Sequence, residues 1–269
     1  MTIRLAAQER DFVGRDLVEK FDFAQSVGFD GIELCAQGDG IFAGRRDELK
    51  RARAAGVVMP SAVVVMPYFV GSLDPADRRK ARDETGRVLG ALAEAGAGGL
   101  VAPNGFAVAS RALPPFTPPR PDAESRDILL SALAELAAIA TREGVEVWLE
   151  PLNRYEDWMV NTLADAVGFV SQVGSPGVAV IADTFHMSIE ETDIPAAIQA
   201  AGGWIHHVQL GDSDRKEPGH GHYDWSATSR ALAAIGYDGW WAMECDLSSA
   251  PANVLPRVSA LLKGLWPNG

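Results

Sequence analysis

The feature that most constrains the fold is an alternation of two kinds of segment, repeated eight times along 269 residues. Each repeat is a short apolar run, then a loop, then a stretch rich in Ala and Leu with helical spacing. The apolar runs, expected to be strands, are Ile3–Ala6, Gly31–Cys35, Val58–Met66, Gly99–Ala102, Val145–Glu150, Val178–Asp183, Trp204–Leu210 and Gly239–Glu244. The expected helices lie near residues 15–27, 44–55, 74–95, 122–143, 162–173, 193–201, 225–235 and 251–264.

This repeat predicts an α/β protein whose residues 1–269 form a single (β/α)8 TIM-barrel domain. A doubly wound open sheet is the competing fold, but no strand candidate is followed by a GxGxxG signature. A glycine follows six of the helices, where a left-handed cap is expected: Gly28, Gly56, Gly96, Gly144, Gly174 and Gly236. Residues that favour N-caps begin four of the same helices: Asp74, Asp122, Thr162 and Asp224.

One segment departs from the repeat. Residues 103–122 contain RALPPFTPPRPD, which is too rich in proline for a helix or a strand. As the loop after the fourth strand it would lie on the catalytic face of a barrel. It is either a wall or lid over a site, or a stiff excursion on the surface.

The charge balance excludes two classes of partner. The formal net charge is −12, so nucleic acid and anionic membrane surfaces, which need a positive face, are not expected partners. The N-terminal MTIRLAAQER has no apolar core of a signal peptide, and no apolar run reaches the roughly 18 residues of a membrane span. The two cysteines, Cys35 and Cys245, suit a reducing compartment. These features predict a cytoplasmic protein.

The candidate site comes from the last four strands, because function in barrels lies at the C-terminal ends of strands. Alternate residues of a strand face opposite sides. In 145–150, Val147 and Leu149 suit the helix side, so Glu150 faces inward; in 204–210, His206 faces the helices while His207 and Gln209 face inward. The polar residues that end these four strands, all expected at one rim, are Glu150, Asp183, Gln209 and Glu244.

Three carboxylates gathered at one rim would repel one another strongly unless a cation neutralised them. Carboxylate oxygens and an amide carbonyl suit Mn²⁺ or Mg²⁺ better than Zn²⁺. The sequence therefore predicts a divalent metal held by Glu150, Asp183, Gln209 and Glu244, with Mn²⁺ as the favoured ion. The alternative is that one or two of these carboxylates pair with Arg154 or Arg215.

Four motifs resemble the xylose isomerase-like TIM-barrel superfamily, and most closely its ketose 3-epimerases of the D-tagatose/D-psicose type. They lie between about residues 145 and 246 and read EPLNRYEDW, ADTFHMSIEE, HVQLGDSDRKEPGHG and GYDGWWAMEC. The resemblance implies Mn²⁺ or Co²⁺ at the four rim residues, with Glu150 and Glu244 as the acid/base pair. It also implies that His186, Arg215 and Glu156 bind the substrate, and that the subunits assemble as homodimers or homotetramers.

The sequence departs from those epimerases at one position. They carry His-x-His in the seventh strand, whereas this chain has His207-Val208-Gln209. The ligand position is therefore Gln209, as in the hydroxypyruvate-isomerase-like branch, with His207 supporting it from below. This departure leaves the metal preference and the exact reaction open.

The expected chemistry is a metal-dependent isomerase reaction in carbohydrate metabolism. A metal that chelates a carbonyl and an adjacent hydroxyl oxygen acidifies the C–H between them, and a carboxylate removes the proton. Return of the proton to the opposite face gives epimerisation, with 3-epimerisation of a free ketose as the first expectation. Return to the neighbouring carbon gives aldose–ketose isomerisation. Loss of a β-hydroxyl gives a lyase reaction, on an inosose or a C-glycoside. A non-catalytic sugar-binding protein is disfavoured because all three carboxylates are present.

Overall fold

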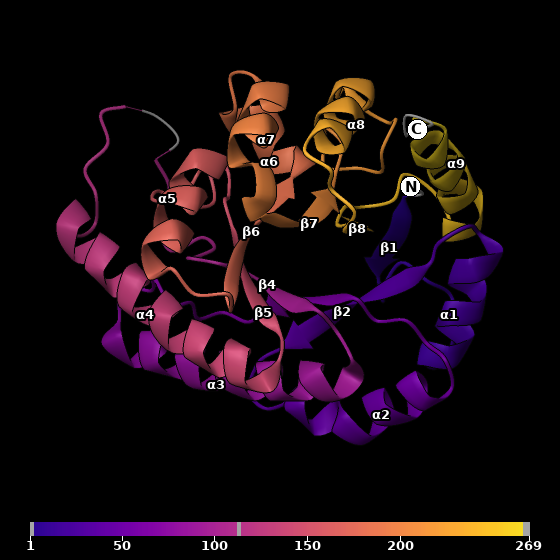
Figure 1. The fold of residues 1–269 in the computed structure, drawn as a ribbon, viewed down its shortest axis with the longest axis horizontal. Helices are drawn as coiled ribbons and strands as arrows, with labels where there is room; N and C mark the ends of the chain where they lie inside the picture. The colour runs from indigo at the N-terminus through magenta and orange to yellow at the C-terminus, as the bar shows by residue number, and fades with distance from the viewer. Residues whose placement is uncertain (1–2, 112–113, 266–269) are drawn as a thin grey trace.

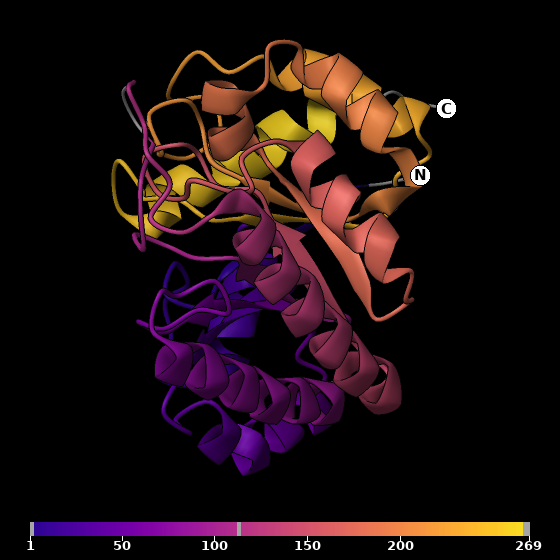
Figure 2. The ribbon, with the colours of Figure 1, turned by 90° about the vertical axis from the view of Figure 1, so that its left-hand side faces the viewer.

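The computed structural model describes residues 3–111 and 114–265. Within them, eight parallel strands pair in sequence order and β8 pairs with β1, which closes the barrel. Helices surround the strands (Figures 1 and 2), so the predicted (β/α)8 barrel is confirmed. The strands are β1 (Arg4–Gln8), β2 (Gly31–Gln37), β3 (Ser61–Val65), β4 (Gly99–Pro103), β5 (Glu146–Glu150), β6 (Val178–Asp183), β7 (Ile205–Leu210) and β8 (Trp240–Met243).

The helices follow the expected pattern with one addition. A short helix, α6, begins directly after β6, because the Asp183 side chain accepts a hydrogen bond from the His186 N–H and so caps its first turn. The helices are α1 (Leu17–Ser26), α2 (Arg46–Ala54), α3 (Pro75–Ala95), α4 (Asp122–Glu143), α5 (Leu163–Val173), α6 (Thr184–Glu190), α7 (Ile194–Ala201), α8 (Trp225–Ala234) and α9 (Pro251–Leu265). No helix among the described residues combines the length and apolarity that a membrane crossing needs.

Three of the four expected N-caps are present. Asp74, Thr162 and Asp224 each accept a backbone N–H at the start of a helix. Asp122 was wrongly expected to be a cap: Pro121 occupies that position without a side-chain bond, and Asp122 lies in the first turn of α4. The acidic side chain there still stabilises the positive end of the helix dipole. The six expected glycine caps all have positive φ, for example 78° at Gly96 and 72° at Gly144.

Part of the barrel interior below the rim is apolar. Val63, Val101, Trp148, Ala179 and Ile181 form a separate buried cluster there. Trp148 comes from β5, whereas its neighbours Val147 and Leu149 belong to the core under the helices. The alternation expected for β5 is therefore confirmed, and it places Glu150 on the inner side at the C-terminal end.

β7 contains an irregularity that the simple alternation did not anticipate. Val180 pairs with Ile205, but the next residue, Ile181, pairs with His207, so His206 is the extra residue of a bulge. His206 is exposed, and its Nδ1 lies 2.7 Å from a carboxylate oxygen of Glu146 at the start of β5, so it does not pack under the helices. Beyond the bulge the expected alternation resumes, and His207 and Gln209 face inward.

Three loops at the C-terminal face are tied together by backbone hydrogen bonds. Gly71 after β3 donates to Asn104 after β4, and Ala107 donates to Glu156 after β5. A Cβ at Gly71 would lie 2.2 Å from Oδ1 of Asn104, so only glycine permits this approach. Arg120 adds bonds to the carbonyls of Gly71 (3.2 Å) and Ser72 (3.3 Å). The proline-rich segment, which stands out between β4 and α4 in Figure 1, is thus anchored at both sides.

A partly buried ion pair fixes the end of β1 against β2 and the start of α2. Arg45 donates two hydrogen bonds to Glu9, at 2.8 and 2.9 Å, and the Cys35 N–H donates a third. Burial alone would raise the pKa of Glu9, but the bonds from Arg45 and Cys35 outweigh it and hold that pKa below its ordinary value.

We expect Glu9→Gln to destabilise the protein by about 2 kcal/mol at pH 7, because charged hydrogen bonds are lost. A lowered folded-state pKa stabilises above the unfolded value and ceases to do so as the pH falls through the folded value. The difference in unfolding free energy between wild type and variant should therefore shrink below a pH of about 4.5. Urea unfolding between pH 7 and pH 3 measures it; a difference independent of pH would contradict the role of the charge.

Candidate active site

Three carboxylates meet at the C-terminal rim, as the sequence predicts. Glu150 ends β5, Asp183 ends β6, and Glu244 directly follows β8. Burial and the charges of Glu244 and Asp183 raise the pKa of Glu150 well above its usual value. Burial raises the pKa of Asp183 to about 7, and burial with the nearby Glu33 and Asp183 raises the pKa of Glu244 to about 8. The cluster is therefore electrostatically costly without a cation.

Gln209 presents an amide oxygen to this cluster. Its Nε2 donates to Oε1 of Glu33 at 2.8 Å, and its buried Oε1 has no hydrogen-bond partner in the part of the chain that the structure describes. Glu33 can only accept from the amide, so the Nε2 side is fixed towards it and the oxygen must point away. The other Glu33 oxygen accepts from Ser61 at 2.7 Å and lies 2.9 Å from Nε2 of His207. His207, stacked on Trp148, supports the site from below, as expected.

Glu33 is therefore a positioning residue, and we expect Glu33→Ala to be strongly destabilising. The substitution leaves the donors of Ser61, His207 and Gln209 without their acceptor in a fully buried place. The expected loss of unfolding free energy is at least about 3 kcal/mol. Denaturant unfolding measures it, with Glu135→Ala, an exposed glutamate on α4, as the matched control. A loss no larger than that of the control would show that Glu33 does not hold this network.

His186 lies in the first turn of α6, the short helix that the sequence analysis did not anticipate. The backbone N–H of Asn153 donates to Nδ1 of His186 at 3.1 Å, so Nδ1 carries no proton. Burial and the charge of Arg215 lower the pKa of His186 to about 3, which keeps the ring neutral. Its proton is therefore on Nε2, which lies 3.5 Å from Glu150 and 3.9 Å from Glu156. This arrangement offers a hydrogen-bond donor to a ligand oxygen.

Arg215 forms an ion pair with Glu156, the same glutamate that lies near Nε2 of His186. It has a left-handed backbone, with φ of 61°, and its guanidinium lies over the ring of Phe185. A strained backbone at a non-glycine residue is characteristic of functional sites. Arg154 pairs with Glu190 instead of the rim carboxylates. The alternative of simple pairing by Arg154 therefore does not account for the acidic cluster.

The donor set fits a divalent cation. One ligand atom each from Glu150, Asp183 and His186 lies within 4.8 Å of the others. Because the proton of His186 is on Nε2, the ring directs a proton, and not a lone pair, towards Glu150. Gln209 pairs with Asp183 across β6 and β7, and its buried amide oxygen has no hydrogen-bond partner among the described residues. Oxygen ligands suit hard ions.

A cavity of about 710 Å³ opens above these residues. It is lined by the expected Glu150, Glu156, His186, Arg215 and Glu244, and by apolar residues that the sequence reasoning missed, including Met66, Phe69 and Phe106. Gln8, the last residue of β1, was also missed: it donates to Glu244 at 2.9 Å. Inspecting the last polar residue of each expected strand would not have found it, because the strand expected at Ile3–Ala6 ends before Gln8, whereas β1 runs to Gln8. His220 and His222 are exposed and bond to Asp214 and Ser213.

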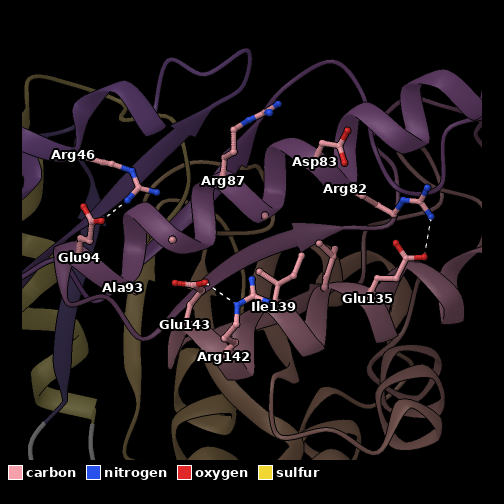
Figure 3. A pocket seen from close by; sticks show the side chains of 13 residues that line it. Arg46, Arg82, Asp83, Arg87, Ala93, Glu94, Glu135, Ile139, Arg142 and Glu143 are labelled. Atoms are coloured by element: carbon pink, nitrogen blue, oxygen red, sulfur yellow. Dashed lines mark hydrogen bonds and ion pairs between the residues drawn. The ribbon is translucent and has the colours of Figure 1, made fainter.

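A second hollow, of about 750 Å³, lies outside the barrel between α3 and α4 (Figure 3). Its walls carry arginines paired with glutamates: Arg46 with Glu94, Arg82 with Glu135, and Arg142 with Glu143. Because these opposite charges compensate one another, the hollow lacks a convergent set of groups for a ligand. The cavity at the strand ends is the candidate active site.

Comparison with known proteins agrees with this geometry. A family model described as xylose isomerase-like TIM barrel matches residues 21–264. The 3-dehydro-D-guloside 4-epimerase of Escherichia coli (strain K12) is 33% identical over 243 residues, which are 90% of this chain and 92% of that protein. A D-psicose 3-epimerase of Ruminiclostridium cellulolyticum is 44% identical over 115 residues, which are 43% of this chain and 39% of that protein.

Two solved structures have the same architecture. The apo form of the 3-keto-D-glucoside 4-epimerase from E. coli has a TM-score of 0.90 at 31% identity, covering 97% of this chain and 99% of that one. A D-psicose 3-epimerase in the presence of D-fructose has a TM-score of 0.75 at 25% identity, covering 98% and 96%.

The chain belongs to the xylose isomerase-like TIM-barrel family. Within it, the chain is an isomerase of the epimerase type, in the group of ketose 3-epimerases and keto-glycoside epimerases. The resemblance found in the sequence motifs is therefore confirmed.

Proposed function

We propose that this protein inverts C4, a hydroxyl-bearing carbon next to the ketone of a 3-keto-glycoside. The reaction would pass through an enediolate that a metal stabilises. The observation that carries the proposal is the placement of Glu150 and Glu244 at one cavity, on β5 and after β8, with β6 and β7 between them. The choice of a keto-glycoside over a free ketose is supported by the match along nearly the whole chain to an epimerase of 3-keto-sugars.

The reaction requires two proton transfers. Glu150 or Glu244 removes the proton from the carbon beside the ketone, and the electron pair of that C–H bond forms the enediolate. The other glutamate, in its protonated form, returns a proton to the opposite face, which inverts the carbon. Exchange of both carboxyl protons with water restores the starting state.

The neighbouring groups hold the oxygens of the substrate. Nε2–H of His186 donates to one oxygen, and the guanidinium of Arg215, held by Glu156, stabilises the negative charge of the enediolate. A divalent ion, with Mn²⁺ favoured over Mg²⁺ or Co²⁺, would be held by Glu150, Asp183, Glu244 and Oε1 of Gln209 and would supply Lewis acidity to the two reacting oxygens.

The proposal extends to the setting of the enzyme. We take residues 1–269 as one TIM-barrel domain that works in the cytoplasm as a homodimer or homotetramer. A second candidate is 3-epimerisation of a free ketose, which the stronger local identity to a D-psicose 3-epimerase favours. Both reactions invert the carbon next to a ketone, so the same residues serve them.

Proton NMR of the Mn²⁺-loaded protein in D2O tests the proposal, with 3-keto-glycosides and free ketoses as substrates. Deuterium at C4 of the keto-glycoside, with a new C4 epimer, is the expected result. Deuterium at C3 of a ketose, with a C3 epimer, would establish the second candidate. Exchange at C1 or C2 would indicate aldose–ketose isomerisation. Elimination without a new epimer would indicate a lyase, and both of these outcomes would overturn the proposal.

A further inference from the structure

The cavity has two chemically different halves. The charged and polar side chains that line it come from β5 to β8 and the loops that follow them. The other half comes from the ends of β3 and β4 and their loops, and is apolar. Its lining residues, here called the apolar wall, are Val65, Met66, Pro67, Phe69, Phe106 and Ala107. A ligand that fills the cavity therefore meets ionic groups at one end and an apolar surface at the other.

Two side chains of the apolar wall remain exposed to water. Val65 and Phe106 are each 46% exposed, although other apolar residues at this end, such as Met66 and Phe69, are buried. Covering such a surface with an apolar group is favourable by about 25 cal/mol per Å². The hydroxyl groups of an extended sugar would gain less from this surface than an aromatic or alkyl group would.

The backbone holds Phe106 in place. The next residue, Ala107, has a left-handed conformation with φ of 57°, and its N–H donates to the carbonyl of Glu156 at 2.9 Å. Glu156 in turn pairs with Arg215 in the polar half. The apolar wall is thus set at a fixed distance from the reacting groups, as a subsite next to a catalytic centre should be.

We propose that the apolar wall is the aglycone subsite of this enzyme and that it selects keto-glycosides with an aromatic or alkyl aglycone. This inference rests on the proposed function. The cavity volume of about 710 Å³ is in the range of pockets that bind drug-sized ligands, roughly 300–1,000 Å³, and leaves room beside one hexopyranose ring. The sugar ring lies at the carboxylates, and the glycosidic substituent lies against Val65 and Phe106.

The test compares methyl and phenyl 3-keto-glucosides as substrates. We expect kcat/KM of the wild-type protein to be at least about tenfold higher for the phenyl glycoside, because burial of a ring is worth more than burial of a methyl group. In Phe106→Ser this ratio should fall towards one. Ile41→Ser is the matched control, because Ile41 is 56% exposed and does not line the cavity; it should keep the wild-type ratio.

The outcomes separate the subsite from the proposed function. If both glycosides are inverted with equal kcat/KM, or if Phe106→Ser keeps the wild-type ratio, the aglycone subsite is refuted while the function stands. If neither glycoside is inverted, the proposed function fails, and calorimetric binding of phenyl and methyl glucosides without the ketone decides the subsite. Tighter binding of the phenyl glucoside that is lost in Phe106→Ser supports it, and equal binding overturns it.

Discussion

Replacement of Glu150 or Glu244 by glutamine is expected to reduce the rate of epimerisation by a factor of about 10² to 10⁴, the usual contribution of a general acid or base. Deuterium exchange makes the experiment specific. With one epimer as substrate, the variant that keeps the base still removes the proton and returns deuterium to the same face. With the other epimer, that variant is inert. Glu150→Gln should therefore catalyse exchange in only one of the two epimers, and Glu244→Gln should catalyse exchange in only the other one.

Asp183→Asn is the matched control for these two variants. Asp183 belongs to the same acidic cluster and is proposed as a ligand, but no proton transfer is assigned to it. Its substitution should abolish exchange with both epimers alike. The assignment of opposite faces to the two glutamates is contradicted if Glu150→Gln and Glu244→Gln behave in this symmetrical way while retaining bound metal.

Removal of the divalent ion is expected to have a similarly large effect. Without it, the enediolate loses its main stabilising charge, and activity should fall by at least about 10³-fold. Addition of Mn²⁺ should restore it. A second readout is thermal: a ligand present at a hundredfold excess over its Kd stabilises the folded state by about 2.7 kcal/mol, so the Tm should rise with Mn²⁺.

Asp183→Asn and Glu94→Gln serve as controls for the metal experiment. The Tm of Asp183→Asn should not respond to Mn²⁺, whereas Glu94→Gln, altered in the outer hollow, should respond like wild type. Full activity in protein whose metal content is shown to be far below one ion per chain would refute the metal requirement. An equal Tm response in all three proteins would refute the location of the site.

Sequence periodicity was sufficient for the barrel and for the meeting of three carboxylates at its rim. Both depend on short-range rules: strand alternation places Glu150 opposite Val147 and Leu149, and barrel topology brings strand ends together. The motif that ends β6 was harder to interpret. Asp183 both ends the strand and caps α6, and a helix of seven residues is too short to show a period. The helical position of His186 was therefore not predicted.

Other features depend on contacts that no local pattern contains. Glu33 holds Gln209 from 176 positions away in the chain, and its partner Ser61 comes from a third strand. The bulge at His206 is a property of how β7 pairs with β6, so single-strand alternation could not predict it. The proline-rich segment gave no sign of which part would face the site. Of the residues of this segment that the structure describes, only the first ones, including Phe106, line the active-site cavity.

The hydrogen bonds that join the loops around the cavity affect how the enzyme binds its substrate. The backbone bonds from Gly71 to Asn104 and from Ala107 to Glu156, together with Arg120, join the segments after β3, β4 and β5 into one frame. A frame assembled during folding has already lost the conformational entropy that a mobile lid would lose when a ligand arrives. Binding is then preorganised: the encounter with substrate depends on diffusion and orientation, and more of the contact energy is left for holding the sugar against the carboxylates.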